Sequence, residues 1–233
     1  MGKQAMDTTS ARDRIFARIR AAQGRAPGVS NGERAAVADY LARHPAGPRP
    51  PAPAQRIESF QEQAQKMAST VERVAALADV PAAAARYLDS LGLLRRAVAW
   101  DSLGTLDWQA QGLTVECRPP VRDAQADHDH GDMVGITGCF CAIAETGSLM
   151  LLSGPQTFAS AALLPETHIA VVPVSRIVDG MEDAFALVRS ERGALPRATN
   201  IISGPSRTGD IEQTIVLGAH GPYRVHVILV EQD

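Results

Sequence analysis

The stretch PAAAARYLDSLGLLRRAVAW, residues 81–100, decides the class of fold. Pro81 opens a predicted helix that Gly92 ends, because proline suits a first helical turn and glycine suits a helix end. The inward-facing positions of this helix are Ala84, Tyr87, Leu88 and Leu91. Residues 96–100 then form a short apolar strand. A helix followed directly by a buried strand is the unit from which parallel sheets are built.

The same alternation runs through most of the chain. Strands are predicted at residues 69–75, 114–118, 132–137, 168–174, 199–203 and 223–231, and helices at 57–68, about 105–111 and 180–191. Residues 141–154 form two further strands joined by a tight turn at Thr146 and Gly147. We therefore predict an α/β fold with a mostly parallel sheet and helices on both faces. Ligands of such sheets bind outside the carboxyl ends of the strands.

The first 55 residues have a different pattern. Ser10 can cap an arginine-rich helix that ends near Gln23, and a second short helix follows Asn31. Five prolines between residues 45 and 53 then form a stiff linker. We predict a helical arm and linker at 1–55 and a compact α/β domain at 56–233. The arm can dock on a neighbouring subunit, in a homo-oligomer, or on an acidic partner.

The bulk composition excludes several classes of protein. A net charge of −3 and a pI of about 6.1 argue against binding to nucleic acid. The sequence has no apolar run of membrane-spanning length and no signal-peptide pattern, so we expect a cytoplasmic protein. Three cysteines are too few for the four thiolates of an iron–sulfur cluster. We expect no cofactor and no metal, since the DHDHGD stretch at 127–132 lacks a convincing ligand spacing.

The chemistry-bearing residues gather near the end of the chain, in GPSRTGDIEQ at residues 204–213. We predict a turn followed by a helix that starts near Thr208, whose free N–H groups would attract an anion. Arg207 would add a charged fork of donors. The candidate ligand-binding residues here are Gly204, Pro205, Ser206, Arg207, Thr208 and Asp210. The alternative is that these residues only cap the helix, with Arg207 paired to Asp210 or Glu212.

Two further candidates lie in glycine-containing turns. His220, in the loop with Gly218 and Gly221, is a candidate proton donor or acceptor, and both glycines are candidate ligand contacts. Glu145 ends an apolar strand and is a candidate nucleophile or acid/base, with Thr146, Gly147 and Ser148 as ligand contacts. The alternative reading of Glu145 is a solvated turn residue. His168 and His226, inside predicted strands, are expected to be structural.

Four segments together resemble the lactate utilization protein C family, whose shared unit is the LUD domain: AIAETGSLMLLSG (142–154), HIAVVPVSRIV (168–178), ISGPSRTGDIEQTIVLGAHGP (202–222) and VHVIL (225–229). The resemblance implies a fold like that of ribose-5-phosphate isomerase and the CoA transferases. It also implies a part in the oxidation of L-lactate to pyruvate, with the iron–sulfur clusters in partner subunits. Ser148 departs from the usual threonine, and Cys139 and Cys141 replace small apolar residues.

Two functions follow from these observations. The first is a component of an L-lactate utilization system that has no cluster of its own and binds a small anionic ligand or a partner subunit. The alternative is a free-standing enzyme of the CoA-transferase or sugar-phosphate isomerase group that uses Glu145. Glu145 is similar to the nucleophilic glutamate of CoA transferases in its position near a glycine turn, and this likeness is an analogy between folds.

Overall fold

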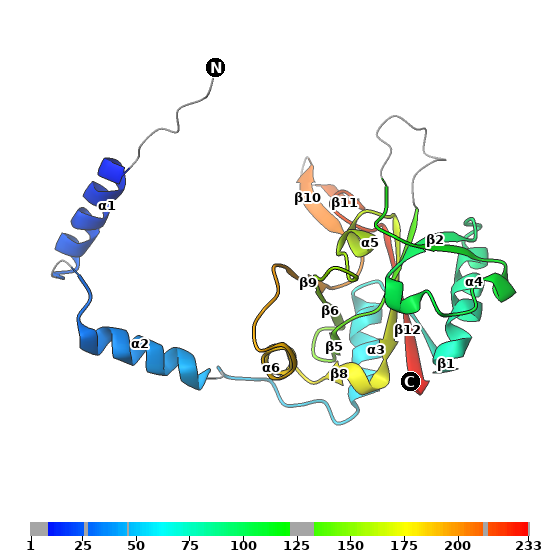
Figure 1. Ribbon diagram of the computed structural model, residues 1–233, viewed down its shortest axis with the longest axis horizontal. Helices are drawn as coiled ribbons and strands as arrows, with labels where there is room; N and C mark the ends of the chain where they lie inside the picture. The colour runs from blue at the N-terminus through cyan, green and yellow to red at the C-terminus, as the bar shows by residue number, and fades with distance from the viewer. Residues whose placement is uncertain (1–8, 26–27, 46, 122–132, 212–213, 233) are drawn as a thin grey trace, which may run out of the picture. The chain divides into compact units, whose positions relative to one another are not determined.

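The computed structural model describes residues 9–25, 28–45, 47–121, 133–211 and 214–232. The chain divides into two compact units, residues 1–49 and 50–233 (Figure 1). The first unit consists of two helices, α1 (Thr9–Ala22) and α2 (Asn31–Arg43), where the sequence predicted them.

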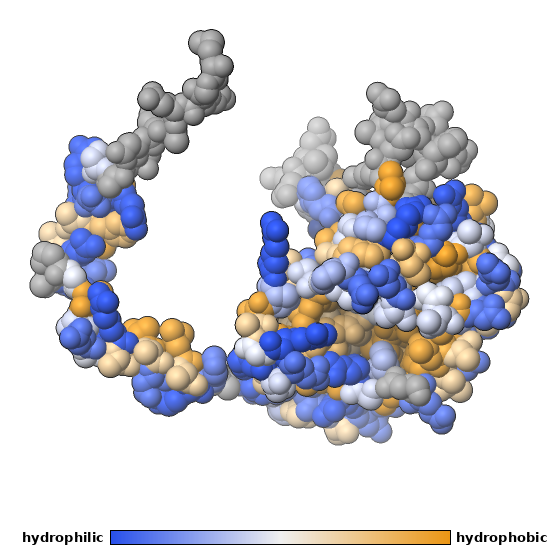
Figure 2. Space-filling model, in the orientation of Figure 1, coloured by the Kyte–Doolittle hydropathy of each residue, from blue (hydrophilic) through white to orange (hydrophobic). Residues whose placement is uncertain are grey.

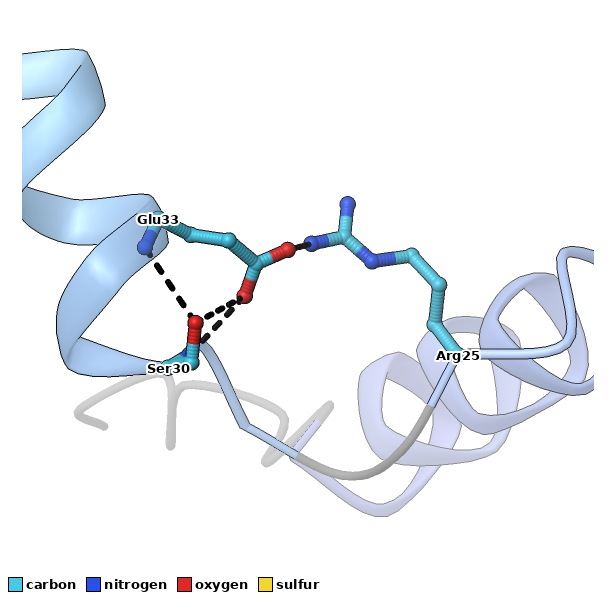
Figure 3. A network of polar contacts seen from close by, with 3 residues as sticks. All are labelled: Arg25, Ser30 and Glu33. Carbon is cyan, nitrogen blue, oxygen red and sulfur yellow. Dashed lines mark hydrogen bonds and ion pairs between the residues drawn. The ribbon is translucent and has the colours of Figure 1, made fainter.

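A polar network fixes the start of α2 (Figure 3). Ser30 Oγ accepts a hydrogen bond from the Glu33 N–H at 3.2 Å, and the Glu33 carboxylate accepts one from the Ser30 N–H at 2.9 Å. Arg25 forms an ion pair with the same carboxylate. This reciprocal capping satisfies free N–H groups of the first turn, so α2 has a defined beginning although it buries none of its side chains.

Both helices of the first unit expose large apolar side chains (Figure 2). On α1 they are Ile15, Phe16 and Ile19, and on α2 they are Val37, Tyr40 and Leu41. Each set follows a helical spacing, as the sequence predicted.

The second unit is organised around a six-stranded sheet in which every neighbouring pair is parallel. Its strands are, in spatial order, β1 (Thr70–Ala76), β12 (Arg224–Gln232), β7 (Thr167–Pro173), β4 (Val134–Thr137), β2 (Arg96–Ala99) and β3 (Thr114–Cys117). The interior strands β12 and β7 are buried over most of their length. This burial on both faces explains their near-continuous apolar sequences.

Each face of this sheet has its own core. On one face α4 (Val80–Ser90) packs Leu88 and its alanines against Ile169, Val171 and Ile228. On the other face α3 (Arg56–Lys66) and the short α5 (Ser160–Leu163) pack against the alternate strand residues, among them Val227 and Leu229. The predicted class, an α/β fold with a mostly parallel sheet, is confirmed.

A second, four-stranded sheet shares the face that α3 covers. Its spatial order is β8 (Ile177–Val178), β5 (Cys141–Ile143), β6 (Ser148–Leu152) and β9 (Thr199–Ile202). Helix α6 (Met181–Arg192) covers its outer side through Ala184 and Val188. The predicted β5–β6 hairpin is present, and its residues are buried on both sides because it lies between α6 and the core.

Two predicted helices are wrong. In place of the helix predicted from about Thr208, β10 (Arg207–Ile211) and β11 (Thr214–Leu217) pair antiparallel, with Thr208 opposite Val216. Their β-branched residues favour strands over helix. Residues 105–108 are irregular, and residues 109–111 form only the single 3₁₀ turn η3 (Gln109–Gln111). Another single 3₁₀ turn, η2 (Asp101–Leu103), precedes them. Gly112, with φ +67°, closes η3, so η3 does not extend into a longer helix.

Candidate functional site

Two of the predicted ligand-contacting glycines lie against α3. Gly147 has φ +65°, and a Cβ there would come 2.2 Å from the backbone nitrogen of Ala64. Gly204 has φ +76°, and its Cβ would come 2.1 Å from the carbonyl oxygen of Met67. Helix backbone fills the direction in which each side chain would extend, so the glycines let two loops pack closely on α3.

A short chain of hydroxyl groups joins these two loops. Thr146 Oγ1 donates to Ser148 Oγ at 2.8 Å, and Ser148 Oγ lies 2.6 Å from Ser203 Oγ. Ser148 is buried. The structure therefore brings the 145–148 turn and the start of the 203–206 loop together through hydrogen bonds between their own side chains.

Ser206 connects the 203–206 loop to the loop that carries His220. Its N–H donates to the Pro222 carbonyl at 2.9 Å, and its carbonyl accepts from the Gly218 N–H at 2.9 Å. Its Oγ accepts from the His220 N–H at 3.3 Å. Gly221 permits this approach, because a Cβ there would lie 3.3 Å from the Ser206 Cβ. Ser206 thus shapes the loop around His220 through backbone contacts.

This loop forms one wall of a cavity of about 530 Å³, here named the His220 cavity. Its lining residues are Leu163, Leu164, Glu166, Leu217, Gly218, Ala219, His220, Gly221, Tyr223 and Arg224. Three of the predicted site residues, Gly218, His220 and Gly221, lie here together. The cavity lies at the amino ends of β7 and β12, whereas the sequence predicted a site at the carboxyl ends of strands.

Arg224 is the principal charged group of the His220 cavity. Its Nη1 donates to Thr167 Oγ1 at 3.1 Å and lies 4.0 Å from the Glu166 carboxylate. The guanidinium carbon lies 5.0 Å from the centre of the Tyr223 ring. These contacts orient the guanidinium. Because this group has five N–H donors, others are left for a ligand. Sequence reasoning missed Arg224, although a cation directly before the buried run 225–230 was a usable signal.

The other predicted site residues lie elsewhere. Glu145 is exposed, its N–H donates to the Asp179 carbonyl at 2.9 Å, and its carboxylate lies beside Gly180, the residue before α6. Arg207 and Thr208 lie on β10, where Arg207 is exposed, and Pro205 is half-buried before it. The side chain of Asp210 lies outside the described part of the structure. Glu145, Pro205, Arg207 and Thr208 do not line the His220 cavity.

The buried histidines have structural environments, as expected. Nε2 of His168 lies 2.8 Å from Thr137 Oγ1, and burial lowers the pKa of His168 to about 4. Nδ1 of His226 lies 2.8 Å from Thr70 Oγ1, and its ring stacks on Tyr87 at 3.9 Å. Burial lowers the pKa of His226 to about 4 as well. Both imidazoles are therefore neutral near pH 7.

The cysteines have raised pKa values for the same reason. Burial raises the pKa of Cys141 to about 11 and also raises the pKa of Cys139. Within the described residues, no three His, Cys, Asp or Glu side chains lie close enough to hold a metal ion. His128, His130 and Asp132 lie outside those residues. None of the described helices is both long and apolar enough to cross a membrane.

Comparison with known proteins agrees with this architecture. Residues 62–230 match the LUD domain. The chain belongs to the LUD domain family. Lactate utilization protein C of Bacillus subtilis is 37% identical over 139 residues, which cover 55% of each chain. The protein of the same name from Bacillus licheniformis is 38% identical over 135 residues, which cover 57% of this chain and 53% of that one. The matched part of this LUD-domain chain thus spans about half the length of these relatives.

One solved structure is similar over a larger share of this LUD-domain chain. It is a DUF162 family protein from Deinococcus radiodurans, with a TM-score of 0.54 and 27% identity. The similarity covers 76% of this chain and 99% of the other. The family suggested by the four sequence segments is therefore confirmed, and so is the class of fold.

Proposed function

We propose that this LUD-domain protein is a component of an L-lactate utilization system and that it binds a small hydroxylated carboxylate in the His220 cavity. The observation that carries the binding proposal is that Arg224 and His220 line the same cavity of about 530 Å³. The link to lactate rests on family membership and on the relatives named lactate utilization protein C.

The two side chains suit the two functional groups of lactate. A guanidinium binds a carboxylate through a planar pair of hydrogen bonds, and an imidazole can donate to or accept from a hydroxyl. Glu166, at 4.0 Å from Arg224, offsets part of the positive charge. We therefore expect moderate affinity, since a ligand carboxylate must compete with a carboxylate of the protein.

The electrons from lactate would pass to partner subunits. The chain has three cysteines, fewer than the four thiolates that an iron–sulfur cluster takes from its protein. We propose iron–sulfur partner subunits as the redox centres and the cytoplasm as the compartment, because free thiols are typical of reducing surroundings. The alternative enzyme that uses Glu145 is not proposed further, since Glu145 does not line the His220 cavity.

Isothermal titration calorimetry with L-lactate tests the binding site. We expect His220→Ala to weaken binding about 10-fold or more, the ratio that corresponds to one lost hydrogen bond of about 1.4 kcal/mol. Arg207→Ala is the control, because Arg207 is exposed and lies outside the cavity. The melting temperature of both variants should stay near that of the parent.

The opposite result would relocate the site. If Arg207→Ala removes binding and His220→Ala does not, the anion binds at the β10–β11 hairpin. If L-lactate does not bind the parent protein at all, the binding proposal is wrong. Growth on L-lactate after deletion of the gene tests the cellular role separately, and unimpaired growth would contradict it.

A further inference from the structure

The order of strands in the six-stranded sheet creates a crevice that the His220 cavity does not use. From β2 the chain continues to β3, its neighbour on one side, whereas from β4 it continues through the second sheet to β7, on the other side. Strands β2 and β4 are adjacent and parallel. Their outgoing connections therefore separate at the carboxyl ends, and in α/β sheets this is the place where ligands bind.

A cavity of about 780 Å³ lies at this point, here named the switch-point cavity. Trp100 and Ser102 line it directly after β2, and Gly138 and Cys139 line it directly after β4. The end of β6 with the loop at 153–157, and the end of α6, form other parts of the lining. Its volume is within the range of about 300–1,000 Å³ typical of small-molecule sites.

The lining carries one more positive than negative charge. Arg176 makes a two-point ion pair with Glu191, at 2.7 and 3.1 Å, and its Nε donates to the Phe140 carbonyl at 2.9 Å. These bonds hold Arg176 in place and neutralise it. Arg192, the last residue of α6, lines the cavity beside this pair and is exposed. Its charge is therefore the one available to an anion.

The remaining polar groups suit hydroxyls. Ser102, Ser153, Gln156 and Thr157 line the cavity and together offer hydroxyl and amide groups. The Thr157 hydroxyl donates to the Leu152 carbonyl at 2.8 Å and so helps to shape the 153–157 loop. Gln156 is exposed. Burial raises the pKa of the Cys139 thiol, so this thiol is neutral at pH 7 and does not repel an anion.

We propose that the switch-point cavity binds an organic anion that carries several hydroxyl groups and is larger than lactate. Arg192 binds the anionic group, carboxylate or phosphate, and Ser102, Ser153 and Gln156 bind the hydroxyls. This site is separate from the His220 cavity, with which it shares no lining residue.

Calorimetry of the full chain with three probes tests the proposal. D-Gluconate carries the carboxylate, D-ribose 5-phosphate carries the phosphate, and D-ribose is the neutral comparison. We expect at least one of the two anions to bind one per chain with a Kd below about 1 mM and D-ribose to bind at least 10-fold more weakly. The preferred anion identifies which anionic group the site selects.

A matched pair of variants locates the site. Arg192→Glu should weaken binding of the preferred anion about 10-fold or more. Arg189→Glu is the control, because Arg189 is exposed on the same last turn of α6 but does not line the cavity. It should change the Kd less than about 2-fold, and His220→Ala should leave the Kd unchanged.

Three results would overturn the proposal. In the first, neither anion binds at concentrations up to about 10 mM, so that any Kd is far above the expected 1 mM. In the second, Arg192→Glu and Arg189→Glu weaken binding equally, so the effect is one of general charge. In the third, His220→Ala removes binding of the anion, which would place it in the His220 cavity.

Discussion

Replacement of Gly147 by alanine tests whether this glycine supports the fold or faces a ligand. A Cβ at this position would lie 2.2 Å from the Ala64 nitrogen and 2.4 Å from the Gln63 carbonyl carbon. Both are backbone atoms of α3 and cannot rotate away. Overpacking of this kind costs about 1–3 kcal/mol, and an alanine at φ +65° adds about 1–2 kcal/mol of strain. We expect Gly147→Ala to lower the free energy of unfolding by about 2–5 kcal/mol.

Gly92→Ala is the matched control. Gly92 has φ +65°, the same as Gly147, but a Cβ there would meet no atom within 4 Å. It should therefore cost only the strain, about 1–2 kcal/mol. Urea unfolding followed by circular dichroism measures both variants, and the difference between them isolates the contact with α3. Equal losses of stability in the two variants would refute the claim that Gly147 is required for packing on α3. If Gly147→Ala then also impairs ligand binding, Gly147 is a ligand contact.

Two further predictions concern pH and the first unit. The pKa of His168 is about 4 in the folded chain and about 6.5 when unfolded, so the unfolded state binds more protons between these values and stability falls as the pH is lowered from 6.5 to 4. The free energy of unfolding should therefore fall by roughly 3 kcal/mol less in His168→Gln than in the parent when the pH is lowered from 7 to 4.5, as measured by urea unfolding. An unchanged pH dependence in this variant would show that His168 is not involved. Removal of residues 1–49 should leave a protein that unfolds cooperatively near the parent's melting temperature, and a non-cooperative thermal transition would show that the helices are integral to the fold.

The sequence predicted the interior strands of the main sheet well because they are buried and apolar on both faces. Strands β7 and β12 could be recognised from their apolar runs, IAVV at 169–172 and VILV at 227–230, and α4 from Pro81, its apolar spacing and Gly92. The second sheet could not be recognised as separate. Its β5–β6 hairpin is buried on both sides, so it has the same apolar pattern as a strand of the main sheet.

The site was harder to predict, for two physical reasons. Around Thr208 the capping residues Ser206 and Asp210 indicated a helix, while Thr208, Ile215 and Val216 favoured strands, and pairing across the hairpin decided the outcome. The switch-point cavity draws its lining from segments between Trp100 and Pro196. Only the spatial order of β2 and β4 brings these segments together, and that order is not contained in any local pattern.

The packing of α3 under the two glycine loops also bears on where a working fragment can start. The family match begins at residue 62, inside α3, which runs from Arg56 to Lys66. A fragment cut at that limit would lose Phe60, a fully buried core side chain, and would leave about one helical turn beneath Gly147. So short a helix is unstable by itself. The unit that folds is therefore longer than the segment that matches the family. A LUD domain transferred from this protein into another should include the chain from about residue 56 onward.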